Sequence, residues 1–159
     1  LLRDHQIEKV YEAIAPWRPE LNWPLRRQSR LQESASHFMA MQEVDGEPNA
    51  DTLIEPIEVL NETWARYRLS PRTGQKHQLR AHHNALGMPI ANDRIYPRLQ
   101  PAPAASEAPD FSRPLQLLAT SLRFTDPVTG RLRCFDSALR LSAEGLALSP
   151  PRCPLPDDA

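Results

Sequence analysis

Apolar and polar positions alternate over residues 7–15, which is the pattern of a β-strand. A period of two places Lys9, Tyr11 and Ala13 on one face of this strand. Five further segments are predicted as strands: 36–44, 53–60, 63–69, 115–124 and 131–135. Pro56 falls within the second of these, so that segment is expected at a sheet edge or around a bulge.

Residues 75–86 have the pattern of a helix. They contain neither proline nor glycine, Thr73 precedes them as a candidate N-cap, and Gly87 follows at the position that ends many helices. The side chains expected to face inward recur at helical spacing: Leu79, His82, His83 and Leu86. Strands interrupted by one clear helix, without a regular βαβ rhythm, predict the α+β class, with a mixed, largely antiparallel sheet and flanking helices.

Prolines mark the connections between these elements, and the chain contains 17 of them. Residues 17–24 are expected to form an irregular connection, and residues 126–130 the turn of a hairpin. The proline- and alanine-rich segment 100–114 is predicted to be a long mobile loop, and residues 149–159 a disordered tail.

Composition narrows the classes of protein that fit. The length of 159 residues suits one domain, and 40% hydrophobic with 25% charged residues indicates a globular chain. The net charge of −1 means that any anion-binding site must be a local patch. No segment is apolar enough for a membrane-spanning helix, and two cysteines make neither a disulfide scaffold nor a zinc cage. A cytoplasmic protein is therefore expected.

The start of the predicted helix is a candidate anion site. Gly74-Gln75-Lys76 lacks the earlier glycine of a nucleotide-triphosphate loop, and His77 stands where that loop has Ser or Thr. Free backbone N–H groups beside Lys76 and Arg72 would suit a phosphate, and a solvated helix start is the alternative. The spacing of His77, His82 and His83 does not match a metal-binding pair, so packing and hydrogen bonding are expected instead.

Arg80 is the most informative charged residue. It lies in the middle of the predicted helix, and the chain has no Asp or Glu between Glu62 and Asp93. A buried guanidinium needs an anionic partner. That partner must come from elsewhere in the fold or from a ligand.

Several motifs together resemble the RluA family of RNA pseudouridine synthases. The run L-S-P-R-T-G-Q-K-H-Q-L-R-A-H at residues 69–82 is similar to the family's L-x-P-x-T-G-R-x-H-Q-L-R-x-H. L-G-M-P-I at residues 86–90, followed by Asp93 and Tyr96, resembles the continuation of that motif. K-V-Y-E-A at residues 9–13 and the turn at residues 126–130 resemble the family's K-x-Y-x-A strand and H-P-x-x-G ending.

The resemblance implies a pseudouridine synthase-like fold and the isomerisation of uridines in structured ribosomal or transfer RNA. The target nucleotide is flipped into the site, a catalytic Asp attacks it, and no metal or organic cofactor takes part. Arg80 matches the family Arg that pairs with the catalytic Asp, and Tyr11 matches the active-site Tyr. The side chains expected to contact RNA are Arg72, Lys76, His77 and Arg94. RNA is the expected partner of a monomeric protein without membrane contact.

The departures from the family pattern concern the nucleophile above all. The family's H-R-L-D motif lies upstream of its K-x-Y-x-A strand, but only eight residues precede Lys9 and no Arg-Leu-Asp occurs in this sequence. Residues 1–148 are therefore expected to be the C-terminal portion of a catalytic domain, inactive alone, with the nucleophilic Asp upstream. Gln75, Asn92 and Leu118 replace the family's Arg, Gly and His.

A non-catalytic RNA-binding relative that starts at Leu1 is the alternative. The enzyme is preferred because a pseudouridine synthase sheet without its upstream strands would expose a long hydrophobic edge.

Overall fold

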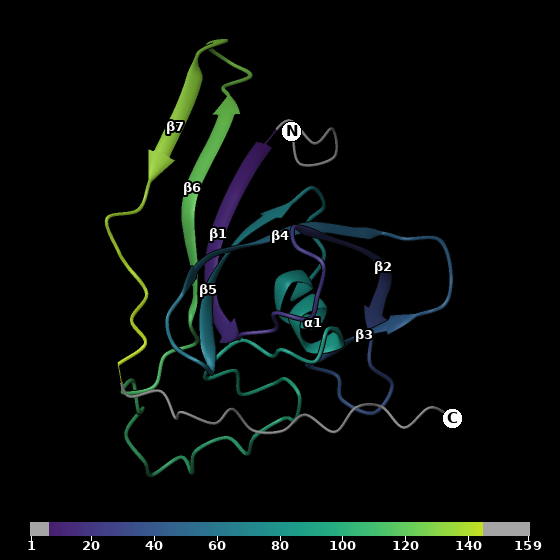
Figure 1. Ribbon diagram of the computed structural model, residues 1–159, viewed down its shortest axis with the longest axis vertical. Helices are drawn as coiled ribbons and strands as arrows, with labels where there is room; N and C mark the ends of the chain where they lie inside the picture. Colours follow the sequence, from purple (N-terminus) through teal and green to yellow (C-terminus); the bar gives the residue numbers. More distant parts are fainter. Residues whose placement is uncertain (1–6, 145–159) are drawn as a thin grey trace.

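The described part of the chain folds into one seven-stranded sheet with one short helix. The computed structural model describes residues 7–144 (Figure 1). The elements in chain order are β1 (Ile7–Pro16), β2 (Leu25–Glu33), β3 (Met41–Val44), β4 (Ala50–Val59), β5 (Trp64–Pro71), α1 (Gln78–Ala85), β6 (Leu117–Thr125) and β7 (Leu132–Asp136). The strand order is β3-β2-β4-β5-β1-β6-β7.

This architecture confirms the predicted antiparallel character and corrects two details. Every strand pair in the described sheet is antiparallel, so the sheet is not mixed. Several flanking helices were expected, but α1 is the one helix among the described residues. In Figure 1 it is surrounded by strands β2, β3, β4 and β5. No helix in the described residues is long and apolar enough to cross a membrane.

The main core lies between α1 and the central strands. Ile54 of β4, Tyr67 and Leu69 of β5 and Ala13 of β1 are fully buried there. Leu79 of α1 packs against this cluster, and Met88 and Ile90 of the following segment complete it. The predicted inward face of the helix is confirmed, because His82 and His83 are also fully buried and Leu86 packs against the core.

Five of the six predicted strands match a strand of the described sheet, and the sixth is shorter than predicted. The strands predicted at 7–15, 53–60, 63–69, 115–124 and 131–135 correspond to β1, β4, β5, β6 and β7. β4 lies between β2 and β5, so its predicted edge position was wrong. The alternative prediction, a bulge around Pro56, was right, because the pairing of β4 with β5 shifts register between Pro56 and Glu58. The strand predicted at 36–44 is confined to β3.

Strand β2 was missed because its sequence is largely polar. Its inward-facing side chains include Arg27 and Ser29, which are polar. Both find polar partners within the fold. Arg27 donates to the carboxylate of Glu43 on β3, and the Ser29 hydroxyl lies 3.0 Å from the His82 ring nitrogen Nε2. Because these inward positions are polar, a search for alternating apolar residues does not detect the strand.

The helix begins later than predicted. Its N-cap is His77 and not Thr73, and α1 starts at Gln78. Thr73 instead accepts a hydrogen bond from the Asp51 backbone N–H at 2.9 Å and donates its hydroxyl to Gln78 at 2.7 Å. The end of the helix agrees with the prediction, because Gly87 follows with φ of +70°.

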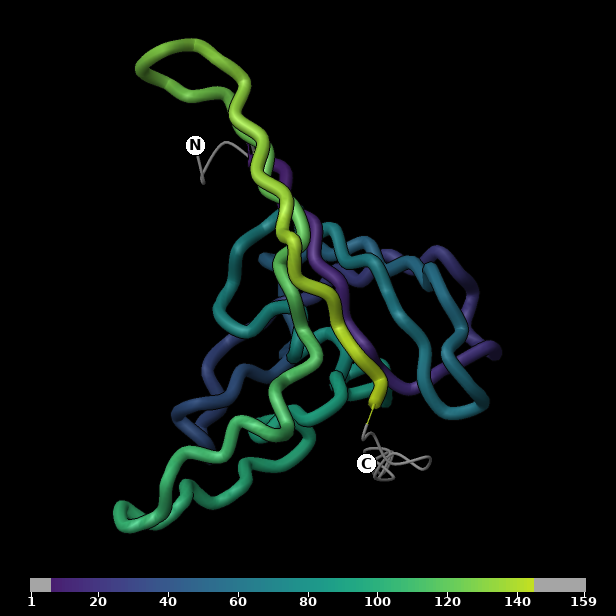
Figure 2. The backbone as a smooth tube through the Cα atoms, turned by 90° about the vertical axis from the view of Figure 1, so that its left-hand side faces the viewer, coloured from purple at the N-terminus to yellow at the C-terminus, as the bar shows by residue number. Residues whose placement is uncertain are grey.

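Two segments extend away from the core. The predicted hairpin is present, and its tip between β6 and β7 projects beyond the rest of the sheet (Figure 2). Every residue of 100–114 is exposed. This exposure agrees with the prediction of a surface loop. The mobility predicted for the loop stays a prediction. The predicted tail at 149–159 lies outside the described residues, so the boundary at 148 also stays a prediction.

Candidate active-site cleft

A cleft of about 340 Å³ opens between β1 and the start of α1. Lys9 and Tyr11 of β1 line one side, and His77 and Arg80 line the other. The remaining lining residues come from the end of β5, the turn before α1, α1 and β6: Pro71, Thr73, Gly74, Gln75, Gln78, Leu79 and Leu117. The structure thus confirms that Arg80 and Tyr11 share one cleft, although nothing in their separation along the chain brings them together.

The turn that carries His77 is fixed by the buried amide of Gln78. Its Oε1 accepts from the Thr73 hydroxyl and from the Gln75 backbone N–H, at 2.7 and 3.1 Å. Its Nε2 donates to the Asp51 carbonyl and to the Thr52 hydroxyl, at 3.1 and 2.9 Å. One amide therefore ties residues 73–78 to strand β4 and holds one wall of the cleft in place.

Arg80 has a partner that the sequence analysis did not identify. Its Nε and Nη2 donate to the two carboxylate oxygens of Asp93 at 2.9 and 2.7 Å, a bidentate geometry. The Asp93 side chain is fully buried, and its Oδ1 also accepts the backbone N–H groups of Ile95 and Tyr96. Hydrogen bonding to Asp93 raises the pKa of Arg80. The intrachain anion facing Arg80 is therefore Asp93.

His77 and Tyr96 form a second polar contact beside this ion pair. His77 Nδ1 lies 3.2 Å from the Tyr96 hydroxyl, and that hydroxyl accepts the Met41 backbone N–H at 2.8 Å. Burial, followed by the positive charges of Arg80 and Lys76, lowers the pKa of His77. The ring is therefore neutral near pH 7.

The other two histidines support the helix from behind, as predicted. His82 contacts the Thr52 hydroxyl at 2.9 Å, and His83 Nδ1 lies 3.2 Å from the Met88 carbonyl oxygen. Burial lowers the pKa of each ring to about 4, so both are neutral structural groups. Among residues 7–144, no group of three or more His, Cys, Asp or Glu side chains is placed to hold a metal ion.

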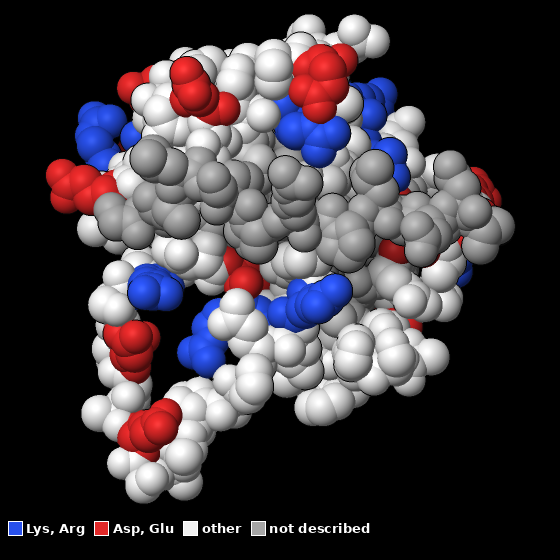
Figure 3. All heavy atoms as spheres, turned by 60° about the horizontal axis from the view of Figure 1, so that its bottom comes forward, with Lys and Arg blue, Asp and Glu red and all other residues white. Residues whose placement is uncertain are grey.

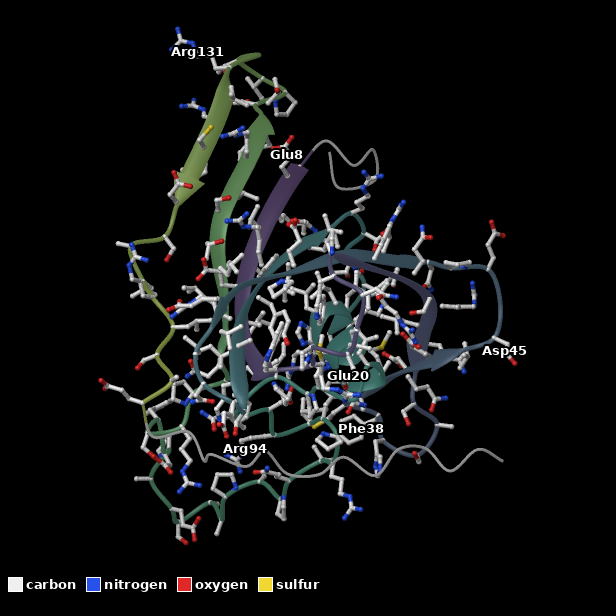
Figure 4. All side chains as sticks on the ribbon, viewed as in Figure 1. Glu8, Glu20, Phe38, Asp45, Arg94 and Arg131 are labelled. Carbon is white, nitrogen blue, oxygen red and sulfur yellow. The ribbon has the colours of Figure 1, made fainter. Side chains whose placement is uncertain are left out.

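The remaining predicted RNA-contacting residues lie around the cleft rather than in it. Lys76 is half-exposed, with its Nζ 3.6 Å from Glu33, and Arg72 is exposed on a neighbouring hollow formed with β1. Arg94 donates to the Pro101 carbonyl at 3.0 Å. It lies below α1, on the side of the 100–114 loop (Figure 4).

A second cavity adjoins the first through Arg80. Its volume is about 620 Å³, and Arg94 and Arg113 line it together with apolar side chains such as Ile95 and Leu115. Figure 3 shows a projecting loop around an opening whose rim carries Lys and Arg side chains together with Asp and Glu side chains. Arg80 therefore lies between two hollows, and neither has an Asp or Glu among its described lining residues.

Two functional candidates, Asp93 and Tyr96, were not predicted from the sequence, and a third, Lys9, was placed on the strand face of Tyr11 without a role of its own. Strand alternation placed Lys9 on the face of Tyr11, which was the available signal for its position in the cleft. Asp93 and Tyr96 lie in a loop whose path depends on tertiary packing, so no local pattern connects them to Arg80 and His77.

The relatives in sequence are RNA-modifying enzymes. The dual-specificity RNA pseudouridine synthase RluA of Salmonella typhimurium is 40% identical over 90 residues, which are 57% of this chain and 37% of that protein. RluA of Pasteurella multocida is 33% identical over 132 residues, covering 66% of this chain and 57% of that protein. The chain thus spans less than two thirds of the length of these curated relatives. It matches no protein-family model.

Two solved human structures share the fold. Human RNA Pseudouridylate Synthase Domain Containing 1 superposes with a TM-score of 0.62 at 20% identity, covering 85% of this chain and 56% of that one. Human RNA Pseudouridylate Synthase Domain Containing 4 gives a TM-score of 0.56 at 20% identity, covering 89% and 60%. The chain is therefore a partial homologue of the RluA-family RNA pseudouridine synthases, with a pseudouridine synthase-like fold.

Proposed function

We propose that this chain forms the base-binding part of an enzyme that isomerises specific uridines to pseudouridine in structured ribosomal or transfer RNA. The observation that carries the proposal is the single cleft into which β1 and α1 bring Lys9, Tyr11, His77 and Arg80. Its volume of about 340 Å³ falls within the range of about 300–1,000 Å³ that is common for small-ligand pockets. A flipped-out uridine is a ligand of that class.

The charge of the cleft suits an RNA ligand. Lys9 is partly buried, and its ammonium has no ion-pair partner among the described residues. A partly buried cation in this position favours an anionic ligand, and the phosphate groups beside a flipped nucleotide supply that charge. Tyr11 offers an aromatic face and a hydroxyl for the base on the same wall of the cleft.

Arg80 has donors left for a second anion. Asp93 takes Nε and Nη2 of the guanidinium, and Nη1 makes no hydrogen bond within the described part of the chain. Because a guanidinium carries five N–H donors, Arg80 can hold Asp93 and also donate to a nucleophilic carboxylate. We therefore assign Asp93 as the residue that positions Arg80, and Arg80 as the partner of the catalytic Asp.

The nucleophile itself is proposed to lie outside these 159 residues. No Asp or Glu of the described chain lines the cleft, and the sequence contains no Arg-Leu-Asp. The same observation favours a second candidate function, in which the chain binds uridine in RNA without isomerising it. Arg72, Lys76 and Arg94 are proposed to contact the surrounding RNA in both cases.

Tritium release from RNA that carries 5-tritiated uridine separates the two candidates. The protein made from the whole gene is expected to release tritium, and the 159-residue chain alone is expected to release none. If neither protein releases tritium while both bind uridine-containing RNA, the non-catalytic function holds. Release by the 159-residue chain would contradict the assignment of the nucleophile.

A further inference from the structure

The geometry around His77 determines which of its ring nitrogens faces the cleft. His77 lines the cleft and Tyr96 does not. The Nδ1 edge of the ring meets the Tyr96 hydroxyl at 3.2 Å, and the two rings lie edge to face with centroids 5.9 Å apart. The opposite edge of the imidazole, which carries Nε2, therefore faces the cleft. Nε2 has no hydrogen-bond partner among the described residues.

The hydrogen bonds of the Tyr96 hydroxyl determine the tautomer of His77. The Tyr96 oxygen accepts the Met41 N–H at 2.8 Å, and among the described residues the hydroxyl's own proton has one acceptor in reach, His77 Nδ1. If Nδ1 carried a proton, the buried phenol proton would have no acceptor, which is costly. Because the low pKa of His77 keeps the ring neutral, its proton must be on Nε2.

The backbone at His77 shows that this ring is held in place by its surroundings. Its φ and ψ of 51° and 22° are in the left-handed region, which few residues other than glycine occupy. Such conformations persist where the neighbouring structure imposes them, and they concentrate at functional sites. The Gln78 amide on one side and Tyr96 on the other provide that constraint.

We propose that Tyr96 locks His77 as an Nε2–H donor for the 4-carbonyl oxygen of the base in the cleft, so that His77 selects uracil against cytosine. Uracil has a carbonyl acceptor at position 4, whereas cytosine has an amino group there, which cannot accept this hydrogen bond. A donor that loses its acceptor on binding the wrong base is a source of discrimination. The inference rests on the proposed function and names how the same cleft chooses its base.

The first experiment measures the tautomer in the unchanged chain. Long-range proton–nitrogen NMR spectra of ¹⁵N-histidine-labelled protein at pH 7 are expected to show an unprotonated Nδ1 and a protonated Nε2 for His77. In Tyr96→Phe the lock is removed, and a mixture of both tautomers is expected. A predominantly Nδ1-protonated His77 in the unchanged chain would overturn the proposal without reference to any variant or ligand.

Two variants of His77 separate donation to the base from local structure. The His77→Asn side chain tolerates the left-handed backbone and places its amide near the position of Nδ1, but it leaves no group at Nε2. The His77→Gln side chain reaches the position of Nε2 and restores an N–H donor there. We expect selectivity to be lost in His77→Asn and partly kept in His77→Gln, even though asparagine suits this backbone better.

Selectivity is read by NMR titration with single-stranded pentanucleotides that differ only in a central uridine or cytidine. The unchanged chain is expected to prefer uridine, and the preference is expected to fall about tenfold in His77→Asn, which equals about 1.4 kcal/mol. A uridine preference that persists in His77→Asn would overturn the role of His77 and leave the proposed function standing. No binding of either oligonucleotide by the unchanged chain would overturn the proposed function and base reading by His77 together.

Discussion

Two arginine–aspartate pairs in this molecule differ in hydrogen-bond geometry and in burial. Arg80 and Asp93 meet through two hydrogen bonds of 2.9 and 2.7 Å beside the cleft, and the side chain of the aspartate is 0% exposed. Arg133 and Asp126 approach to 3.5 Å in the β6–β7 hairpin, where their side chains are 48% and 21% exposed. The same two residue types thus form a buried bidentate pair in one region and a solvated contact in the other.

The surroundings of the two pairs explain the difference. Each aspartate also accepts two backbone N–H groups, so these bonds do not distinguish the pairs. The Arg80 guanidinium, however, lies 5.6 Å from the centre of the Tyr96 ring, beside the core. All residues of β7 are exposed, and Arg131 at the tip of the hairpin points into solvent (Figure 4). Buried and hydrogen-bonded contacts are therefore concentrated where residues 88–96 pack against β1 and α1, next to the cleft.

The largest difference is expected when each arginine is truncated. Arg80→Ala leaves a buried carboxylate without its counter-ion, which costs about 3–5 kcal/mol of unfolding free energy. Arg133→Ala removes a solvated contact, which contributes at most about 1 kcal/mol. Urea denaturation of the two variants beside the unchanged chain measures both values. Equal losses would show that burial does not distinguish the two pairs.

Truncation of an apolar residue is also expected to cost more stability in the core than in the β6–β7 hairpin, by a slightly smaller difference. Leu69 of β5 is 0% exposed, whereas Leu132 of β7 is 61% exposed. Leu69→Ala removes core contacts and leaves a cavity, so we expect a loss of about 2–5 kcal/mol. Leu132→Ala is expected to change stability by about 0.5 kcal/mol or less. A loss above about 2 kcal/mol for Leu132→Ala would mean that the hairpin is packed against something in solution.

Lowering the pH is expected to destabilise the cleft region through its buried histidines. His82 and His83 have pKa values of about 4 in the fold against about 6.5 when unfolded. Between these values the unfolded chain binds more protons, so the free energy of unfolding falls as the pH drops from 6.5 towards 4. The loss approaches about 3 kcal/mol for each histidine at the lower limit.

Matched substitutions isolate this effect. His83→Leu cannot take up a proton and should make the dependence on pH shallower between 6.5 and 4.5, although it also loses the contact with the Met88 carbonyl. His37 is exposed, so His37→Gln should leave the slope unchanged. Denaturation at a series of pH values measures the slopes, and identical slopes for His83→Leu and the unchanged chain would contradict the assignment.

The contrast also explains what the sequence predicted well. The helix, its buried face and the end at Gly87 follow from local spacing, since each depends on neighbours within a few residues. Tyr11 and Lys9 were placed on one strand face by alternation alone, and the structure confirms that both line the cleft.

What the sequence did not predict depends on contacts between distant segments. Asp93 reaches Arg80 because residues 88–91 pack into the core, with the Ala91 N–H donating to the Ile14 carbonyl at 2.9 Å. β2 was missed because Arg27 and Ser29 face inward to polar partners. The helix start was misplaced because the Gln78 amide, rather than a Thr73 cap, organises the turn. In each case a tertiary hydrogen bond overrides the local pattern.

The most direct test of the central claim is the single-turnover rate of uridine isomerisation at saturating RNA, with the protein made from the whole gene. Arg80→Lys keeps a positive charge beside Asp93 but loses the planar fork, so we expect a rate at least tenfold below that of the unchanged protein, with little change in RNA affinity. Arg133→Lys is the matched control and should react at the unchanged rate. A rate for Arg80→Lys within about threefold of the unchanged protein, or roughly 0.7 kcal/mol, would contradict a catalytic role for Arg80 in this cleft.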